Sequence, residues 1–435
     1  MFIVNAIRVL VKGEFNRNVL TLMTGTGLAQ LIPLGVTPIL SRLYNPEQFG
    51  VFALFTATVS SLAAVVTGRY ELAIMLPRKN ADAINVAALS IAICFITSTI
   101  LLIAAWTLND RISTALGNSA ICTWLYFVPL AVLLNGIYSN LNYWSNRNKL
   151  YRIMAHRRVL QSGGTSAVQI ALGFLRTDAG GLVIGSIFGQ ALASAMMANI
   201  IFRHNRNIWR VIDKRKTLVL AKRYISCVKF LVPAHVLSAL AVQLPAVFVT
   251  ANFGLSAAGY YLFAERLVGM PVSLVSASIG DVFRQKMAES YTAGNHCRKN
   301  FVSTLWKLVA ISTPPFSLCL FFSPLVFAHL FGERWRVAGE YAQLMCPMFY
   351  FRFISNPLSL VAIIAQKNRF EFLWQAGLLM CLLLVTAIHY FVDLDAKDFI
   401  LGFVAVSAIF DLINLAASYM FACAGDLRLQ KPQSS

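Results

Sequence analysis

Four ionisable residues stand inside long apolar stretches of the sequence: Glu265, Arg266, Arg352 and Asp411. Arg266 lies eight residues into the stretch 258–283, which at about 1.5 Å per helical residue places it roughly 12 Å from the start of a membrane span. A charge at that depth costs about 3 kcal/mol or more, so it usually faces protein or a water-filled cavity. An arginine in such a cavity can bind an anion such as phosphate through paired hydrogen bonds.

Arg266, Arg352 and Asp411 lie at similar depths in three predicted spans that run in the same direction, so we expect them to share one cavity. In the functional interpretation the two arginines attract an anion, and Asp411 or Glu265 competes for them and titrates. In the alternative, an ion pair such as Arg352–Asp411 only locks two helices. Glu265 is about 100° around the helix from Arg266, so the two face different neighbours. Asp281, nearer the end of that span, is interpreted as a cap or gate residue.

The composition identifies the protein class that must position these residues. Hydrophobic residues make up 58% of the chain and charged residues 13%, whereas a soluble domain is about 25% charged, and the mean hydropathy is +0.66. Each apolar stretch is close to the ~20 residues that a helix needs to cross a bilayer. The fold class predicted is an all-α polytopic membrane protein of about twelve helices, at 19–41, 49–68, 83–106, 120–141, 158–175, 181–202, 230–251, 258–283, 303–327, 339–365, 372–391 and 399–423.

Basic residues are distributed asymmetrically between the two sides of the predicted membrane. With the N-terminus inside, 29 of the 37 Lys and Arg fall on one side or at that end of a span, two lie deep within spans, and only six fall on the other side. Those six are Arg42, Arg111, Arg176, Arg334, Arg336 and Lys397. This bias is the positive-inside rule, and it predicts that both termini are cytoplasmic. The net charge of +19 is therefore explained by topology and by attraction to anionic lipid, and we expect no nucleic-acid partner.

The spans divide into two predicted lobes of six. We expect a cytoplasmic amphipathic segment at 1–18, an N-lobe at 19–202, a basic cytoplasmic linker at 203–229, a C-lobe at 230–424 and a cytoplasmic tail at 425–435. The N-terminal segment is either a short helix in the membrane interface or a frayed basic tail. The eight scattered cysteines and six histidines have no metal-ligand spacing, and we expect neither a metal nor a cofactor.

Three motifs carry a resemblance to a known family: SRLYNPEQFGVFAL with GRYELAIMLP, the long segment QLPAVFVTANFGLSAAGYYLFAERLVGMPVSLVSASIGDVF, and FGERWRVAGEYAQLMCP. In this order, on twelve spans, they resemble the polysaccharide-transport branch of the MOP superfamily, which also contains the MATE transporters, and most closely the bacterial O-antigen (Wzx-type) flippases. The similarity runs from about residue 16 to about 424.

The resemblance implies a flippase that moves undecaprenyl-pyrophosphate-linked oligosaccharide across the bacterial inner membrane, for polysaccharide or lipopolysaccharide biosynthesis. It implies alternating access between two lobes, coupled to an ion gradient as in an antiporter, with a polysaccharide polymerase and a chain-length regulator as candidate partners. Residues that fall on the family pattern include Arg42, Arg69 and Arg266. Arg69 is then either a contact for the lipid headgroup at the cytoplasmic mouth or an interfacial anchor, and Arg42 is a further candidate contact.

Two other functions remain as alternatives. A multidrug or cation antiporter of the same superfamily would need an acid at mid-depth in the first six spans, and the sequence offers none there. A membrane enzyme such as a polysaccharide polymerase would need a sizeable extramembrane segment, and the outward loops are short. We therefore expect a transporter and not an enzyme, with an anionic cargo.

Overall fold

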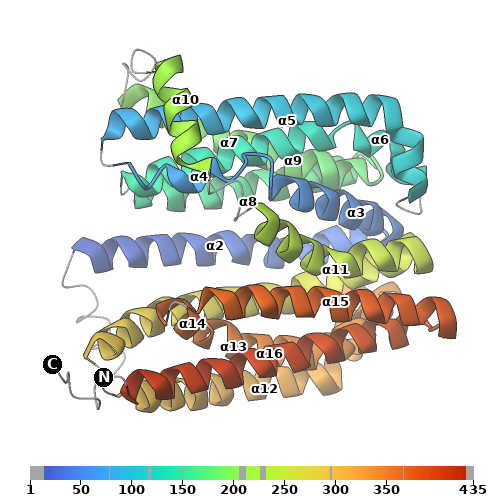
Figure 1. Ribbon diagram of the computed structural model, residues 1–435. Coiled ribbons are helices and arrows are strands. Elements are labelled where there is room, and N and C mark those ends of the chain that lie inside the picture. Colours follow the sequence, from blue (N-terminus) through green and yellow to red (C-terminus); the bar gives the residue numbers. More distant parts are fainter. Residues whose placement is uncertain are drawn as a thin grey trace. The chain divides into compact units, whose positions relative to one another are not determined.

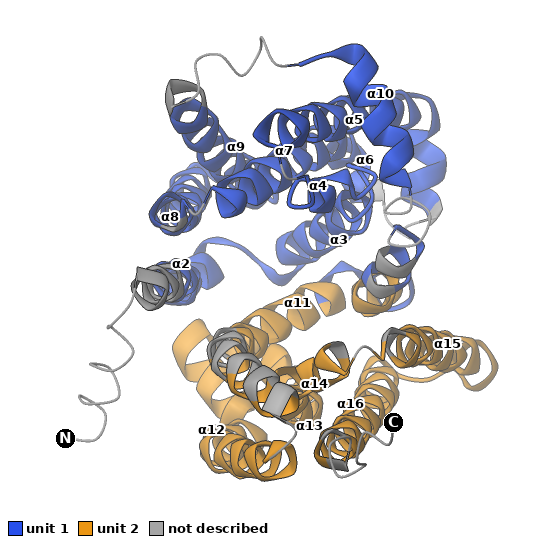
Figure 2. Ribbon diagram, turned by 60° about the vertical axis from the view of Figure 1, so that its left-hand side comes forward, with its two compact units in different colours: residues 1–239, 250–256 blue, residues 240–249, 257–435 orange. Residues whose placement is uncertain are grey.

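The computed structural model describes residues 14–77, 79–115, 119–148, 150–204, 212–225, 232–293, 296–365 and 367–427. These residues form helices and turns with no β-strand among them (Figure 1). By their contacts they separate into two compact units (Figure 2), unit 1 with residues 1–239 and 250–256 and unit 2 with residues 240–249 and 257–435. The predicted segment 1–18 and tail 425–435 fall mostly outside the described residues.

Unit 1 contains the helices of the first half of the chain. They are α2 (Glu14–Leu43), α3 (Pro46–Ala63), α4 (Tyr70–Ala73), α5 (Asn80–Ala115), η1 (Ser119–Ile121), α6 (Cys122–Leu125), α7 (Val128–Arg147), α8 (Tyr151–Phe174), α9 (Gly180–His204) and α10 (Lys214–Arg223). Its long helices pack side by side, α8 against both α2 and α9, and α7 against both α5 and α9.

Unit 2 contains most of α11 and the helices after it. They are α11 (Val232–Ala293), α12 (Cys297–Phe331), η4 (Glu333–Trp335), α13 (Arg336–Leu358), α14 (Leu360–Ile364), α15 (Asn368–Val392) and α16 (Ala396–Leu427). Here α13 packs between α12 and α16. Trp335 is fully buried and stacks on Phe263 with ring centroids 4.0 Å apart, which ties the start of α13 to α11.

Each of the twelve predicted spans coincides with a helix, an arm of α11, or two consecutive helices. In the described part of the chain, seven helices are long and apolar enough to cross a membrane by composition alone. The helix α11 supplies two predicted spans, because its helical geometry is broken at Gly254 (φ 84°, ψ 175°). Helices such as α2, α8 and α13 are long but carry more polar residues, which need protein neighbours in a bilayer.

The two units divide the chain differently from the predicted lobes. Residues 240–249 belong to unit 2, where Phe248 stacks on Phe399 with ring centroids 4.3 Å apart. The following segment, 250–256, belongs to unit 1. There the carbonyl of Leu255 packs directly on Gly50 of α3, where a Cβ atom would collide with it.

The described part of the predicted linker is not a free connection. Its helix α10 packs on α5, with Leu220 buried in a cluster that includes Val86 and Trp144. The hydroxyl of Thr217 donates to the side-chain oxygen of Asn85 at 3.0 Å. This part of 203–229 is therefore docked on unit 1 through its apolar face, while its basic residues are exposed.

Candidate functional site

The charges predicted at mid-depth in unit 2 come from α11, α13 and α16. Arg352 of α13 forms an ion pair with Asp411 of α16, with Nε and Oδ2 3.7 Å apart. That distance exceeds the range of a hydrogen bond between nitrogen and oxygen. The Asp411 side chain is 7% exposed and that of Arg352 33%, so the pair is loose and one partner remains accessible. The Arg352 guanidinium also lies 5.8 Å from the ring centre of Phe349.

Glu265 and Arg266 of α11 have different surroundings, as their spacing on a helix predicts. Glu265 interacts electrostatically with Arg352, so Arg352 is influenced by two carboxylates, those of Glu265 and Asp411. Arg266 forms no ion pair with the described residues, and its Nε is buried without a hydrogen-bond partner among them. Buried polar groups almost always have partners, so an orphaned guanidinium N–H needs an explanation.

These surroundings make one of the two arginines a better candidate for binding an anion than the other. From the sequence, Arg266 and Arg352 are equivalent anion-binding candidates that are expected to share one cavity. In the structure Arg352 already has acidic neighbours, whereas Arg266 has a donor to spare. Unit 2 contains a cavity of about 630 Å³. Its lining includes Leu267 and Phe353, which follow Arg266 and Arg352 in the sequence, but not the arginines themselves.

The predicted site residue Arg69 lies in an irregular turn of unit 1. The helix α3 ends at Ala63, and Gly68 and Arg69 adopt left-handed backbone conformations (φ 57° and 60°) before α4 begins. Arg69 Nη1 pairs with Glu71 Oε1 at 3.3 Å, and the Thr67 hydroxyl donates to the other carboxylate oxygen of Glu71. Glu71 itself is only 2% exposed.

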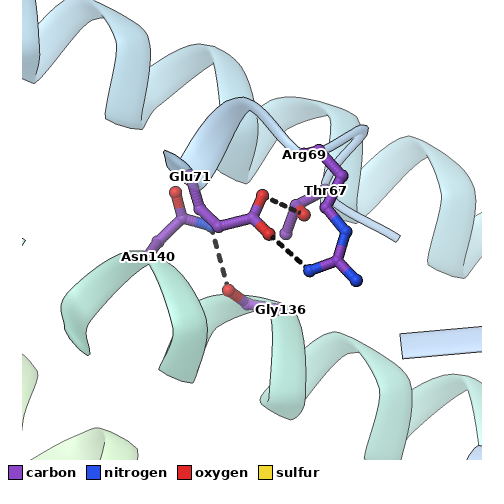
Figure 3. A network of polar contacts seen from close by, with 5 residues as sticks. All are labelled: Thr67, Arg69, Glu71, Gly136 and Asn140. Atoms are coloured by element: carbon purple, nitrogen blue, oxygen red, sulfur yellow. Dashed lines mark hydrogen bonds and ion pairs between the residues drawn. The ribbon is translucent and has the colours of Figure 1, made fainter. Parts of the chain in front are cut away.

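Figure 3 shows how this turn meets α7. Asn140 of α7 lies beside Glu71, and its amide nitrogen donates to the carbonyl of Gly136 at 2.9 Å. Asn140 is 2% exposed, and its amide oxygen has no partner among the described residues. The Arg69 side chain, 18% exposed, is thus held mostly inside unit 1 by Glu71, which limits its reach as a headgroup contact.

Arg42 and Asp281 are the two remaining predicted site residues. Arg42 lies in the last turn of α2 and is exposed. Asp281 lies within α11, but its side chain is outside the described set.

Arg157 of α8 is a buried charge that the apolar pattern of the sequence does not predict. In the sequence it directly precedes the apolar run 158–175 and so falls outside the predicted spans. The helix instead begins at Tyr151, and Arg157 is fully buried. Its Nη2 donates to the Tyr138 hydroxyl at 2.5 Å, and its guanidinium lies 3.9 Å from the centre of that ring. The spacing of Arg157 and Gln161, one helical turn apart, was the available signal of a polar stripe.

Comparison with known proteins adds a family and a fold. The chain matches the family model described as polysaccharide biosynthesis protein over residues 39–340. No curated protein matches it.

Several solved structures are similar over most of their length. One is the lipid II flippase MurJ in an inward closed conformation, 12% identical, with a TM-score of 0.72 over 93% of this chain and 90% of that one. Another is an inward-facing multidrug resistance MATE family transporter of the MOP superfamily, 14% identical, with a TM-score of 0.69 over 93% of this chain and 96% of that one. A third is a MOP superfamily transporter from Pyrococcus furiosus, 16% identical, with a TM-score of 0.60 over 96% and 98%. These structures confirm the predicted fold class, an all-α fold like that of solved transporters of the MOP superfamily.

Proposed function

The chain belongs to the polysaccharide biosynthesis protein family, and on this premise we propose that it is a flippase for undecaprenyl-pyrophosphate-linked oligosaccharide. It moves the repeat unit of an O-antigen or related polysaccharide across the bacterial inner membrane by alternating access. The family and the transporter fold support transport and not catalysis. The uneven distribution of Lys and Arg supports cytoplasmic termini.

The observation that carries this proposal is the buried, unpartnered Nε of Arg266. The pyrophosphate is the part of the cargo that hydrocarbon excludes most strongly, since an isolated charge is very costly there. A guanidinium group stays charged and presents donors that match phosphate oxygens in pairs. Arg266 has an unused donor of this kind. Arg69 and Arg157 also have buried guanidinium nitrogens without a partner among the described residues. Because Arg69 is paired with Glu71 and Arg157 packs on the Tyr138 ring, we assign pyrophosphate binding to Arg266.

Arg352, Asp411 and Glu265 are assigned to coupling. The Arg352–Asp411 pair is 3.7 Å long, so the carboxylate holds the arginine without a closed hydrogen bond. An anionic cargo and a proton or sodium ion can both alter this balance, the first by competing for Arg352 and the second by occupying a carboxylate. This gives a physical route from an ion gradient to cargo release.

The drug-antiporter alternative would need an available buried acid in the first half of the chain. Glu71 is buried there, but it is paired with Arg69 and accepts a hydrogen bond from Thr67. Its negative charge is therefore already compensated, which favours an anionic over a cationic cargo.

The test is complementation of a bacterial strain that lacks its own flippase, with defined repeat units and surface polysaccharide as the measured output. We expect the full chain to restore surface polysaccharide for at least one repeat unit. Membrane-inserted protein that restores none, while the strain's own flippase does, would contradict the proposal. Dependence on a polymerase or a chain-length regulator is tested in the same strain by deleting each.

A further inference from the structure

A second cavity, of about 210 Å³, lies inside unit 1 and has a different chemical character. Helices α3, α7, α8 and α9 all contribute to its lining. Its polar side chains carry amides and hydroxyls but no formal charge, and they include Thr56, Asn135, Gln161, Thr165, Ser186 and Gln190. The volume is far above the ~15 Å³ that a single water needs, so the cavity can hold a small polar ligand.

Three amides form a chain across this cavity. The Gln161 amide nitrogen donates to the Gln190 side-chain oxygen, and the Gln190 amide nitrogen donates to the Asn135 oxygen at 3.5 Å. Asn135 in turn donates to the backbone carbonyl of Ala131 at 2.9 Å. An amide has two N–H donors and two acceptor lone pairs, and these bonds use one N–H of each. Gln190 is only 6% exposed, so its position is fixed by packing.

The packing of α8 on α9 builds this chain. At Gly189 a Cβ atom would collide with the Thr165 hydroxyl and lie 2.7 Å from the carbonyl oxygen of Gln161. Only glycine lets the two helices approach this closely, and the approach places Gln161 opposite Gln190, the residue after Gly189. The amides are therefore part of a preformed site.

The lining selects for one class of ligand. A phosphate is bound most strongly beside a cation, and the described lining holds none, whereas an apolar compound would leave the amide groups without hydrogen-bond partners. Sugar hydroxyls both donate and accept hydrogen bonds, as the amides and hydroxyls here do. Phe55 adds an aromatic ring to the same cavity. By contrast, the 630 Å³ cavity of unit 2 is almost entirely apolar.

We propose that the cavity of unit 1 is a carbohydrate subsite that binds a neutral sugar residue of the cargo. This inference rests on the proposed function and adds to it a division of labour, in which amides of α7, α8 and α9 bind sugar while Arg266 binds pyrophosphate. Variation in residues that line this cavity would then tune which repeat unit is accepted.

The test measures binding of two soluble probes to the full-length protein in lipid nanodiscs. One probe is the lipid-free repeat-unit oligosaccharide released from a polysaccharide whose export the protein restores, and the other is inorganic pyrophosphate. The variants are Asn135→Leu, Gln161→Leu and Thr56→Val. Thr58→Val is the matched control, because Thr58 is on the same helix and also bonds the carbonyl four residues earlier, but it does not line the cavity.

We expect each cavity variant to weaken oligosaccharide binding by about 2- to 12-fold, the effect of one lost hydrogen bond, with pyrophosphate binding unchanged. Thr58→Val should bind both probes normally. Retained pyrophosphate binding shows that a variant is folded. If the two leucine variants lose pyrophosphate binding, the proposal is judged on the milder variant Thr56→Val.

Oligosaccharide binding that is absent in the wild type, or equal in Thr56→Val and Thr58→Val, overturns the subsite. That result leaves the flippase proposal standing if complementation succeeds. Failure of complementation for every repeat unit would instead contradict the flippase proposal itself.

Discussion

Two arginines that look alike in the sequence have different electrostatic surroundings in the structure. Both Arg266 and Arg352 interrupt apolar stretches, and the sequence gives no reason to rank them. Arg352 is paired with Asp411 and acts on Glu265, whereas Arg266 has an orphaned Nε. Position along the helix predicted that Glu265 and Arg266 face apart, but only packing decides which arginine obtains an acidic neighbour.

The first prediction concerns Arg266. Replacing it with Ala should reduce surface polysaccharide about tenfold or more, the effect of a lost charged hydrogen bond. It should not lower the thermal stability of the protein, because an unpaired buried charge does not stabilise the fold. Arg266→Lys should retain part of the activity, since lysine keeps the charge but not the fork.

Arg336→Ala is the control, because Arg336 is half exposed and pairs with Glu333. Surface polysaccharide is measured together with the amount of inserted protein. Normal display with Arg266→Ala at normal expression would remove Arg266 from the binding site.

The second prediction concerns the coupling pair. Asp411→Asn abolishes the charge that opposes Arg352 and cannot take up a proton, so transport in proteoliposomes should lose most of its pH dependence. Asp398→Asn, an exposed change in the first turn of the same helix, should leave the pH profile as in the wild type. An unchanged profile for Asp411→Asn would make the Arg352–Asp411 pair purely structural.

The irregular backbone after α3 and within α11 determines where neighbouring residues lie. The irregular turn after α3 carries Arg69 and Glu71 into the interior of unit 1, and the break at Gly254 turns α11 into two spans. The segment 250–256 of α11 packs on α3, where Gly50 contacts the Leu255 carbonyl. The side-chain oxygen of Glu47 lies 3.5 Å from the Ser256 hydroxyl at the same place.

The third prediction follows from this contact. Gly50→Ala places a methyl group against the backbone of Leu255, which cannot move as a flexible side chain could. Overpacking of this kind costs about 1–3 kcal/mol, so the thermal unfolding temperature of the detergent-solubilised protein should fall. Gly35→Ala, in α2, has open space around the new methyl and should be neutral or slightly stabilising. Equal unfolding temperatures for the two variants would contradict the close approach.

At the scale of the whole molecule, apolar run length predicted the helices well. A bilayer requires about 20 apolar residues per span, so each helix leaves a strong local signal. Run length does not predict which unit a segment belongs to, because tertiary contacts determine this. Residues 240–249 pack in unit 2 through Phe248, and the next seven residues belong to unit 1. The docking of α10 and the burial of Arg157 also depend on tertiary contacts, and neither was predicted. In a membrane protein, segments with basic residues are normally assigned to loops.

The candidate site was predictable only in part. Charges inside spans pointed to Arg266, Arg352 and Asp411, since such charges are costly. The amide cavity of unit 1 left no such signal, because Asn135, Gln161 and Gln190 are uncharged and come from three different helices. Their meeting depends on the glycine-mediated approach of α8 and α9.

The most direct measurement reconstitutes the purified protein in proteoliposomes and follows movement of undecaprenyl-pyrophosphate-linked oligosaccharide from one leaflet to the other. The account predicts translocation well above that of protein-free liposomes, competition by inorganic pyrophosphate, and at least a tenfold loss with Arg266→Ala. Translocation that is equal with and without the protein, or equal for Arg266→Ala and the wild type, would contradict it.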